Sequence, residues 1–372
     1  MKRKALILAV GLTVGLLPCP AAAKKAPLED SSFVYGVFAD NPTCEQVEQR
    51  LAQAPLRGTV LLSVENGQGF LLDQPGGDEL LACALQRLEA SSRRAKALIL
   101  QDTSFLERQD ESERRVRLLA QFAATHRSVL EGVLIDVEPY VDDRWSCATL
   151  PERRQIGRDY LALLRRLKAA SGKLKVEAAI PWWYSLNDDI PELLPEAILK
   201  EADGVYFMVY GDEGGPVVSG RAEKVISRLP AARLPNQRGR SYIALATYES
   251  HSPAELEAEI TQVRQYYARA RRFGGTAIFH AASEFNAPLV RVVSGVVTDA
   301  QGNGVAAAEV EAAGVTVKTN MCGKFTMKGL PGGQATLRVL KEGYEPLSLG
   351  IDPPDPGRER ELRPIQLSPK KR

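Results

Sequence analysis

The sequence has little of the chemistry that builds metal centres, nucleic-acid interfaces and membrane spans. Its 3 His residues (His126, His251 and His280) are scattered, and its 5 Cys residues show no zinc-site spacing. The 48 Lys and Arg nearly balance the 46 Asp and Glu, which leaves a net charge of +2, and no basic cluster follows one periodic face. Beyond the first residues, no apolar run is long enough to cross a bilayer. We therefore expect no metal or other cofactor, no nucleic-acid partner and no transmembrane segment.

The first 23 residues have the pattern of an export signal. A positive segment at 2–4 precedes an apolar segment at 5–17, and the alanines at 21–23 offer an A-x-A cleavage site. Cys19 also suggests a lipoprotein, but Pro18 directly before it is a poor residue for that cleavage. We expect a secreted or periplasmic protein whose signal peptide is cleaved near residue 23.

Between residues 30 and 288, short β-branched runs alternate with segments of helical pattern. The predicted strands cover 33–39, 58–64, 96–101, 132–138, 174–181, 204–210, 240–247 and 275–280. The predicted helices cover 44–53, 78–92, 112–127, 151–171, 191–201, 222–229 and 253–272, the last with Ser252 as its N-cap. Eight strands with crossover helices over about 250 residues predict an α/β fold, a (β/α)8 TIM barrel. An open doubly wound sheet would normally show a glycine-rich first turn, which this sequence lacks.

Export makes the remaining cysteines informative. Removal of the signal leaves Cys44, Cys83, Cys147 and Cys322, an even number in an oxidising compartment. Cys44 opens the predicted helix after the first strand, and Cys83 lies in the helix after the second. Because helices that follow neighbouring barrel strands lie side by side, Cys44–Cys83 is the most plausible disulfide, and the connectivity otherwise stays open.

At residue 291 the composition changes, and short β-runs with many glycines replace the helical pattern. The defining segments are 294–299, 302–304, 308–310, 319–325, 330–333 and 341–344. They resemble the carboxypeptidase regulatory-like domain, a small transthyretin-like β-sandwich. The resemblance covers residues 291–370 and implies a noncatalytic spacer or adhesive unit, which suggests contact with a cell surface or matrix.

Two acids end the fourth predicted strand, which runs through Gly132 to Glu138. Because side chains alternate along a strand, Leu134, Asp136 and Glu138 share one face, and the opposite face is aliphatic. Acids two residues apart rise by about 7 Å, close enough for one charge to disfavour ionisation of the other. A carboxylic acid kept protonated in this way is what cleavage of a glycosidic bond requires. A structural alternative is a strand end whose acids pair with arginine or cap the next helix.

The same segment resembles the signature of glycoside hydrolase family 18, D-G-x-D-x-D-x-E. Gly132, Asp136 and Glu138 fit this signature, Glu131 is a conservative departure, and Leu134 replaces an acid. Further along, Tyr206-Phe207-Met208-Val209-Tyr210 is similar to the family's M-x-Y segment on the sixth strand, although Gly211 stands where an Asp usually follows.

The resemblance implies substrate-assisted hydrolysis of a β-linked N-acetylhexosamine. Glu138 would protonate the leaving oxygen while the sugar's own acetamido oxygen attacks the anomeric carbon, so the enzyme needs no nucleophile. Asp136 would orient and polarise the acetamido group, and Tyr210 would donate a hydrogen bond to it. The missing acid at Leu134 weakens the proton relay behind Asp136, which leaves a slow or inactive enzyme open.

Aromatic residues near the same rim are the candidates for binding the glycan. Trp182, Trp183 and Tyr184 follow the fifth strand and form a possible stacking platform, although one of these rings is expected in the core. The remaining candidates are Tyr140, Met208 and Tyr248; the position of Met208 midway along its strand also fits simple packing.

Two alternatives stay open. A retaining glycosidase with two carboxylates could use Glu138 with Glu249, at the end of the seventh strand, if these groups lie about 5–5.5 Å apart. A noncatalytic, lectin-like barrel that binds a glycan is the second alternative, and the presence of Glu138 argues against it. The sequence does not specify which glycan is bound.

Overall fold

The structure is a computed structural model that describes most of the chain. The described residues are 28–54, 56–66, 69–126, 129–141, 143–210, 221–235, 239–247, 252–279, 291–354 and 359–370. The predicted signal peptide and Cys19 lie outside them. Within these ranges, every helix is too short or too polar to cross a bilayer.

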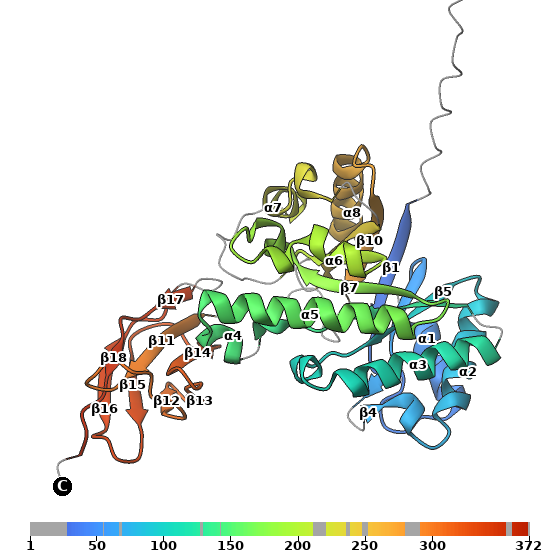
Figure 1. The fold of residues 1–372 in the computed structure, drawn as a ribbon. Coiled ribbons are helices and arrows are strands. Elements are labelled where there is room, and N and C mark those ends of the chain that lie inside the picture. The colour runs from blue at the N-terminus through green and yellow to red at the C-terminus, as the bar shows by residue number, and fades with distance from the viewer. Residues whose placement is uncertain are drawn as a thin grey trace, which may run out of the picture.

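The larger body is a closed barrel of eight parallel strands, which confirms the predicted α/β fold (Figure 1). Neighbours pair in the order β1, β2, β5, β6, β7, β8, β9 and β10, and β10 pairs with β1 to close the ring. The strands are β1 Glu29–Val34, β2 Thr59–Ser63, β5 Arg94–Ile99, β6 Leu130–Ile135, β7 Lys175–Pro181, β8 Gly204–Met208, β9 Arg240–Ala246 and β10 Phe273–Phe279.

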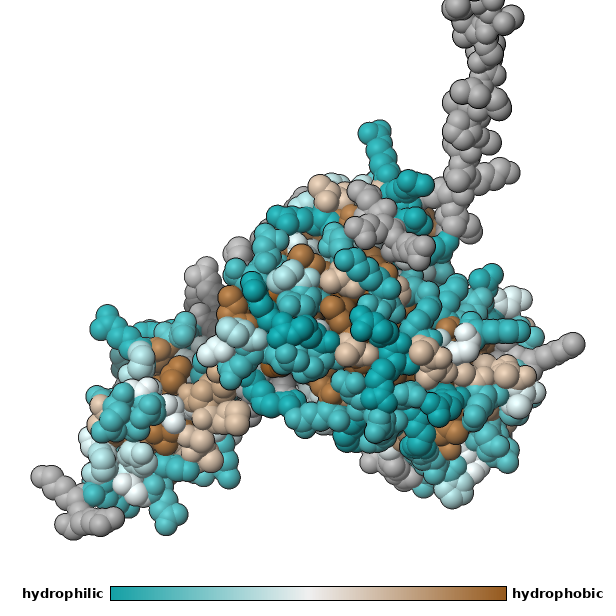
Figure 2. All heavy atoms as spheres, in the orientation of Figure 1, coloured by the Kyte–Doolittle hydropathy of each residue, from teal (hydrophilic) through white to brown (hydrophobic). Residues whose placement is uncertain are grey.

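Helices follow the strands and cover the outside of the barrel (Figure 1). They are α1 Cys44–Gln53, α2 Gly77–Ala90, α3 Gln109–Thr125, α4 Asp143–Cys147, α5 Leu150–Ala170, α6 Pro195–Glu201, α7 Arg221–Arg228 and α8 Pro253–Tyr267. The predicted N-cap of the last helix is confirmed, since the Ser252 hydroxyl accepts the N–H of Glu255 at 3.2 Å. Figure 2 shows a mostly hydrophilic surface over α5, where Arg165 and Arg166 pair with Glu201 and Glu113.

The prediction for the first strand was wrong. It placed the strand at 33–39, but β1 covers Glu29–Val34, because Gly36 has a φ of +71° and turns the chain out of the sheet. The Arg50 guanidinium then holds the turn by donating to the carbonyls of Gly36, Val37 and Ala39 at 3.2, 2.9 and 2.7 Å. The strand begins with polar residues, which the predicted strand left out. Its serines are nevertheless buried, because residues from other elements cover them.

Two other segments also differ from the prediction. The helix predicted at 191–201 is a 3-10 turn, Pro191–Leu193, followed by α6, because Pro195 holds Leu194 in an extended conformation with ψ of 141°. A short hairpin, β3 Glu65–Asn66 with β4 Gly69–Phe70, follows β2 and was not predicted.

Side-chain alternation divides the barrel into two apolar cores. One cluster fills the interior with residues from every strand, among them Leu61, Leu98 and Leu134. The other lies between strands and helices and contains Val133 and Ile135. At the foot of β6, a Cβ on Gly132 would lie 2.7 Å from the Lys175 carbonyl oxygen, so glycine permits the close contact with β7.

A buried ion pair closes the N-terminal end of the barrel. The Lys96 ammonium, 1% exposed, lies 2.7 Å from Glu177 Oε2 and donates to Tyr206 Oη at 2.9 Å. Burial alone would lower the pKa of Lys96, but the nearby groups Glu177, Tyr242 and Glu29 outweigh it and raise the pKa of this lysine. The cation is therefore compensated inside the protein, at the face of a TIM barrel that serves stability.

The C-terminal module has two sheets packed around a separate apolar core. One sheet contains β14 Lys324–Lys328, β11 Val292–Thr298, β17 Glu359–Glu361 and β18 Ile365–Gln366. The other has the order β13 Val315–Lys318, β12 Glu309–Ala312, β15 Ala335–Leu340 and β16 Leu347–Ile351. This arrangement confirms the predicted all-β domain.

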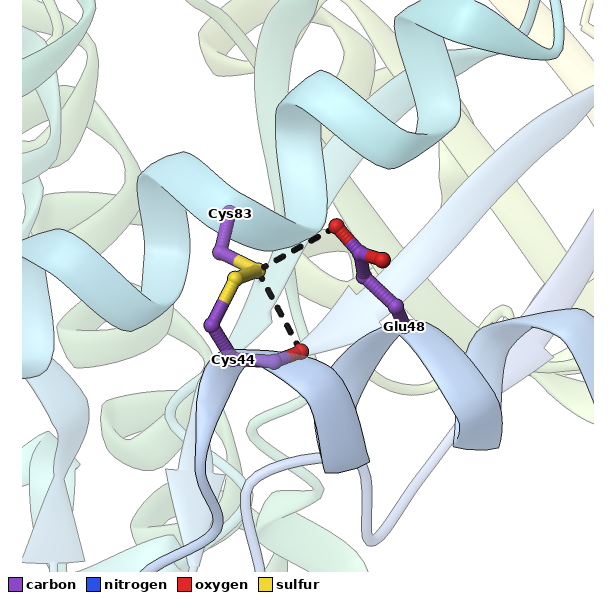
Figure 3. Close-up of side chains that lie close together, drawn as sticks. All are labelled: Cys44, Glu48 and Cys83. Atoms are coloured by element: carbon purple, nitrogen blue, oxygen red, sulfur yellow. Dashed lines mark hydrogen bonds between the residues drawn. A yellow bond between two sulfur atoms is a disulfide. The ribbon is translucent and has the colours of Figure 1, made fainter.

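Two disulfides connect the four cysteines after the predicted signal. Cys44 joins Cys83 and thereby links α1 to α2 (Figure 3), which confirms the predicted pair. Cys147 joins Cys322, so α4 of the barrel is bonded to the C-terminal module, which lies beside α4 in Figure 1. Next to this bond, Asn320 Nδ2 donates to Ser146 Oγ at 2.8 Å.

We expect Lys96→Met to lower the free energy of unfolding of the barrel by about 3–5 kcal/mol, because it leaves Glu177 buried and unpaired. The double variant Lys96→Met/Glu177→Leu should recover most of this loss. Tryptophan fluorescence in urea measures the barrel alone, since all 3 Trp lie between residues 145 and 183. Lys200→Met, on the exposed surface of α6, serves as the control; a single variant as stable as the parent would contradict a structural role for the pair.

Cys147→Ala with Cys322→Ala removes the second disulfide. We expect the barrel and the module to move independently of each other in this variant. The bond closes a loop of 175 residues, and the chain-entropy model gives such a cross-link about 5 kcal/mol. Small-angle X-ray scattering should show a larger radius of gyration for this variant. Cys44→Ala with Cys83→Ala, which cuts a bond inside the barrel, should leave the radius unchanged.

Candidate active site

The acidic pair lies beyond the end of β6, at the end of the barrel where the strands stop. The predicted strand through Glu138 was three residues too long, because β6 ends at Ile135. Leu134 packs in the interior cluster and Val137 in the outer one. The Asp136 N–H donates to the Ile99 carbonyl at 3.1 Å, which holds this segment beside the end of β5. In a TIM barrel, this is the face that carries active sites.

The carboxyl of Asp136 is largely withdrawn from water. Its Oδ1 atom is buried and has no hydrogen-bond partner among the described residues. Burial raises the pKa of Asp136 to about 6; the hydrogen-bonding side chain of Gln101 lowers it in part, and the charge of Glu65 raises it further. The sequence predicted that Asp136 and Glu138 disfavour each other's ionisation, but the charge that raises the pKa of Asp136 is that of Glu65.

Glu138 is only partly buried, and an adjacent phenol orients its carboxyl. The Tyr140 Oη donates to Glu138 Oε1 at 2.8 Å. Tyr140 lies in the 3-10 turn Pro139–Val141 that directly follows the acid. This hydrogen bond limits the rotation of the Glu138 carboxyl group.

Three aromatic rings form a cluster beside Glu138. The Tyr140 ring lies edge-on to Trp183 at 5.2 Å and to Tyr184 at 6.2 Å, and Trp183 lies edge-on to Tyr184 at 4.7 Å. Tyr184 is 1% exposed and is therefore core, whereas Trp183 is partly exposed. Trp182 makes a different contact. The Arg228 guanidinium carbon lies over its ring, 5.2 Å from the ring centroid.

A second aromatic group comes from the ends of β8, β10 and β1. The Tyr210 ring stacks on Phe279 at 5.2 Å, and Phe279 lies edge-on to Tyr35 at 5.5 Å. Burial, then the charges of Asp136 and Glu138, raises the pKa of Tyr35, so this tyrosine lies within electrostatic reach of both acids. Tyr210 thus belongs to the same aromatic group as Tyr35.

Other predicted site residues lie deeper or outside the described part. Met208 is 7% exposed and packs in the interior cluster, below the rim. Tyr248 and Glu249 lie outside the described residues, as does His280. The distance between Glu138 and Glu249, which bears on the two-carboxylate alternative, is thus not described.

Three rim residues escaped the sequence reasoning: Tyr35, Glu65 and Gln101. Tyr35 lies two residues after Phe33, on the same face of the predicted strand, and Gln101 ends a predicted strand. Their positions in the sequence could therefore have identified both as rim residues. Glu65 gave no such signal, because it lies in the short hairpin after β2.

One group of possible metal-ligating side chains occurs among the described residues, and it lies away from this rim. It consists of Cys44, Glu48 and Cys83, shown in Figure 3. The two sulfur atoms are bonded to each other, so neither is a thiolate that could hold a metal ion.

Comparison with known proteins gives one family match and several distant structural likenesses. No curated protein matches the sequence. Residues 292–363 match the carboxypeptidase regulatory-like domain family, which confirms the resemblance seen in the sequence.

Several of the structural likenesses are to glycosidases at low identity. A family 18 chitinase from Pseudoalteromonas aurantia is 12% identical, covering 68% of this chain and 94% of its own, with a TM-score of 0.45. A chitinase from Chromobacterium violaceum is 14% identical, covering 69% and 95%, with a TM-score of 0.40. A β-glucuronidase from Bacteroides uniformis is 11% identical with a TM-score of 0.43; the match covers 82% of this chain but spans only 42% of that enzyme.

These likenesses do not determine the reaction of the barrel, which has to be inferred from its own side chains. The family match is specific to the second body. Residues 292–363 therefore form a carboxypeptidase regulatory-like domain attached to a TIM barrel.

Proposed function

We propose that the barrel is an exported glycoside hydrolase that cleaves β-linked N-acetylglucosamine-containing glycans by substrate-assisted acid catalysis. The observation that carries this proposal is the hydrogen bond from Tyr140 Oη to the carboxyl of Glu138, two residues after Asp136, whose Oδ1 is buried. A carboxyl group that a phenol holds in one orientation can serve as the general acid for a glycosidic oxygen. The resemblance of residues 131–138 to the family 18 signature supports the same assignment.

In the proposed reaction, Glu138 gives its proton to the leaving oxygen as the bond to the anomeric carbon breaks. The acetamido carbonyl oxygen of the same sugar forms a new bond to that carbon, and water later opens the ring with Glu138 accepting a proton. Asp136, as a carboxylate, stabilises the positive charge that develops on the acetamido nitrogen. Tyr210, which follows β8, donates a hydrogen bond to the acetamido group.

Aromatic rings would bind the sugars beside these groups. Trp183 is partly exposed and belongs to the cluster that contains Tyr140, so a pyranose ring can pack against its exposed surface. The two disulfides support an exported protein, because such bonds persist in oxidising compartments. The C-terminal module would then hold the enzyme near a surface or matrix.

Glu138→Gln should lower kcat by about 100- to 10,000-fold, because the amide cannot supply a proton. Release of reducing ends from acetylated chitooligosaccharides and peptidoglycan fragments measures the effect, with de-acetylated oligosaccharides as substrates that should resist cleavage. Glu131→Gln is the matched control, since that acid pairs with Arg94 at 3.0 Å at the foot of the same strand. Binding without turnover by the parent chain would favour the lectin-like alternative, and cleavage of de-acetylated substrates would contradict acetamido assistance.

Asp136 should set the acidic limb of the pH profile. Its pKa of about 6 means that the carboxylate becomes protonated as the pH falls through about 6, so kcat should fall there and Asp136→Asn should be slow at every pH. The same pKa also predicts how the stability of the fold changes with pH. Because the folded pKa lies above the unfolded value near 3.9, ionisation of Asp136 destabilises the fold as the pH rises from about 4 to 6.

Asp136→Asn should therefore raise the free energy of unfolding at pH 8 by up to about 3 kcal/mol and leave it nearly unchanged at pH 4. Urea unfolding followed by tryptophan fluorescence at the two pH values checks this without any substrate. Equal changes in the free energy of unfolding at both pH values would contradict a raised pKa of Asp136 in the folded state.

A further inference from the structure

The C-terminal module is bonded to the barrel at one short helix, α4. The disulfide between Cys147 and Cys322 joins the last residue of this helix to the module. One residue earlier, Ser146 accepts two hydrogen bonds from the module. Asn320 Nδ2 donates to its Oγ at 2.8 Å, and Lys324 Nζ donates to its carbonyl oxygen at 2.8 Å. Two consecutive residues of α4 are therefore held by three bonds from one turn of the module.

The turn that makes these bonds is rigid. Asn320 Oδ1 accepts the N–H groups of Cys322 and Lys324 at 3.1 and 2.9 Å, so the side chain that donates across the interface also fixes the turn. Gly323 has a φ of +78°, and a Cβ there would lie 2.2 Å from the Val297 carbonyl oxygen, so glycine lets the turn pack against β11. The module thus presents its donors to α4 from a fixed position.

Helix α4 depends on such support because it has only five residues, Asp143–Cys147. A helix this short is not stable on its own. On the barrel, Trp145 is 8% exposed and packs in the outer apolar cluster, and its carbonyl oxygen accepts a hydrogen bond from Arg153 Nε at 3.0 Å. The helix is therefore held by the barrel through Trp145 and by the module through Ser146 and Cys147.

The turn that orients the carboxyl of Glu138 precedes α4 by one residue. It is the 3-10 turn Pro139–Val141, and it packs against α4. The Val141 N–H donates to the Glu138 carbonyl oxygen at 3.1 Å and closes the turn, and Tyr140 Oη donates to the Glu138 carboxyl at 2.8 Å. Helix α4 therefore fixes the C-terminal end of the turn that carries the Tyr140 hydroxyl.

We propose that Asn320 and Lys324 of the C-terminal module are positioning residues for Glu138. By holding Ser146 they fix α4, and α4 keeps the Tyr140 hydroxyl on the Glu138 carboxyl. The inference rests on the proposed function for its catalytic meaning, since Glu138 is the group that protonates the leaving oxygen. It gives the module a part in the reaction in addition to attachment to a surface.

The test releases the module from α4 without changing a residue of the rim. Ser146→Ala removes the side-chain acceptor and Lys324→Met removes the donor to the backbone, while the disulfide keeps the module attached. This double variant should lower kcat roughly three- to tenfold and change KM by less than about twofold, because the substrate contacts stay in place. Lys328→Met, exposed on the same strand β14, is the matched control and should keep the parent kcat.

A double-mutant cycle shows whether the effect passes through Tyr140. Tyr140→Phe alone should lower kcat about tenfold, because it removes one hydrogen bond to a carboxyl group. Adding Ser146→Ala and Lys324→Met to Tyr140→Phe should then cause almost no further loss. Losses that multiply would mean that the module acts by general destabilisation, which overturns the inference. Ser146→Thr, which keeps the hydroxyl acceptor, should retain the parent kcat.

Amide hydrogen exchange on the full chain measures the same coupling without substrate. The Val141 N–H should exchange about tenfold faster in the Ser146→Ala/Lys324→Met variant, whereas the N–H groups of β6 should exchange at the parent rate. In an active parent, an unchanged kcat or an unchanged Val141 rate in this variant overturns the inference and leaves the proposed function intact. If the parent chain hydrolyses no glycan while Val141 exchanges faster in the variant, the proposed function fails and the coupling of the module to the Glu138 turn stands.

Discussion

The candidate site depends on one carboxyl group that is held away from water at the open end of a closed barrel. Asp136 ends the apolar run of β6, and the segment that carries it is fixed to Ile99 by a backbone hydrogen bond. Burial disfavours its charged form, and Glu65 adds a second negative charge. Burial of this acid lowers the stability of the fold and brings its pKa closer to neutral pH. An acid in contact with water would have neither effect.

Buried charge is compensated at one end of the barrel and uncompensated at the other. At the N-terminal end, Lys96 meets Glu177 at 2.7 Å and a tyrosine hydroxyl, so the charges compensate each other. At the rim, Asp136 has an amide and a like charge as its neighbours, and one of its oxygens has no partner in the described part. The compensated pair fits a structural role, whereas the uncompensated acid is the arrangement expected of a functional group.

The C-terminal module is attached close to this rim. Cys147 lies in α4, only a few residues after Tyr140, and its disulfide to Cys322 bonds the module to the segment that orients Glu138. Asn320 and Lys324 both contact Ser146 on the same side. A module that approaches a surface would thus bring the mouth of the barrel with it, because the two bodies are joined at that mouth.

The sequence by itself determined the fold class, the positions of most strands, the Cys44–Cys83 pair and the carboxypeptidase regulatory-like domain. The fold class and the strands follow from the period of apolar residues, turn glycines and caps. The cysteine pair follows from the order of the helices, and the domain from the resemblance of residues 291–370 to its family. Only the tertiary structure decided that β1 begins at Glu29, that Leu100 leaves the strand alternation, and that Glu65, Gln101 and Tyr35 stand beside Asp136. These residues belong to four different barrel segments, and no spacing along one chain encodes which of them meet when the ring closes.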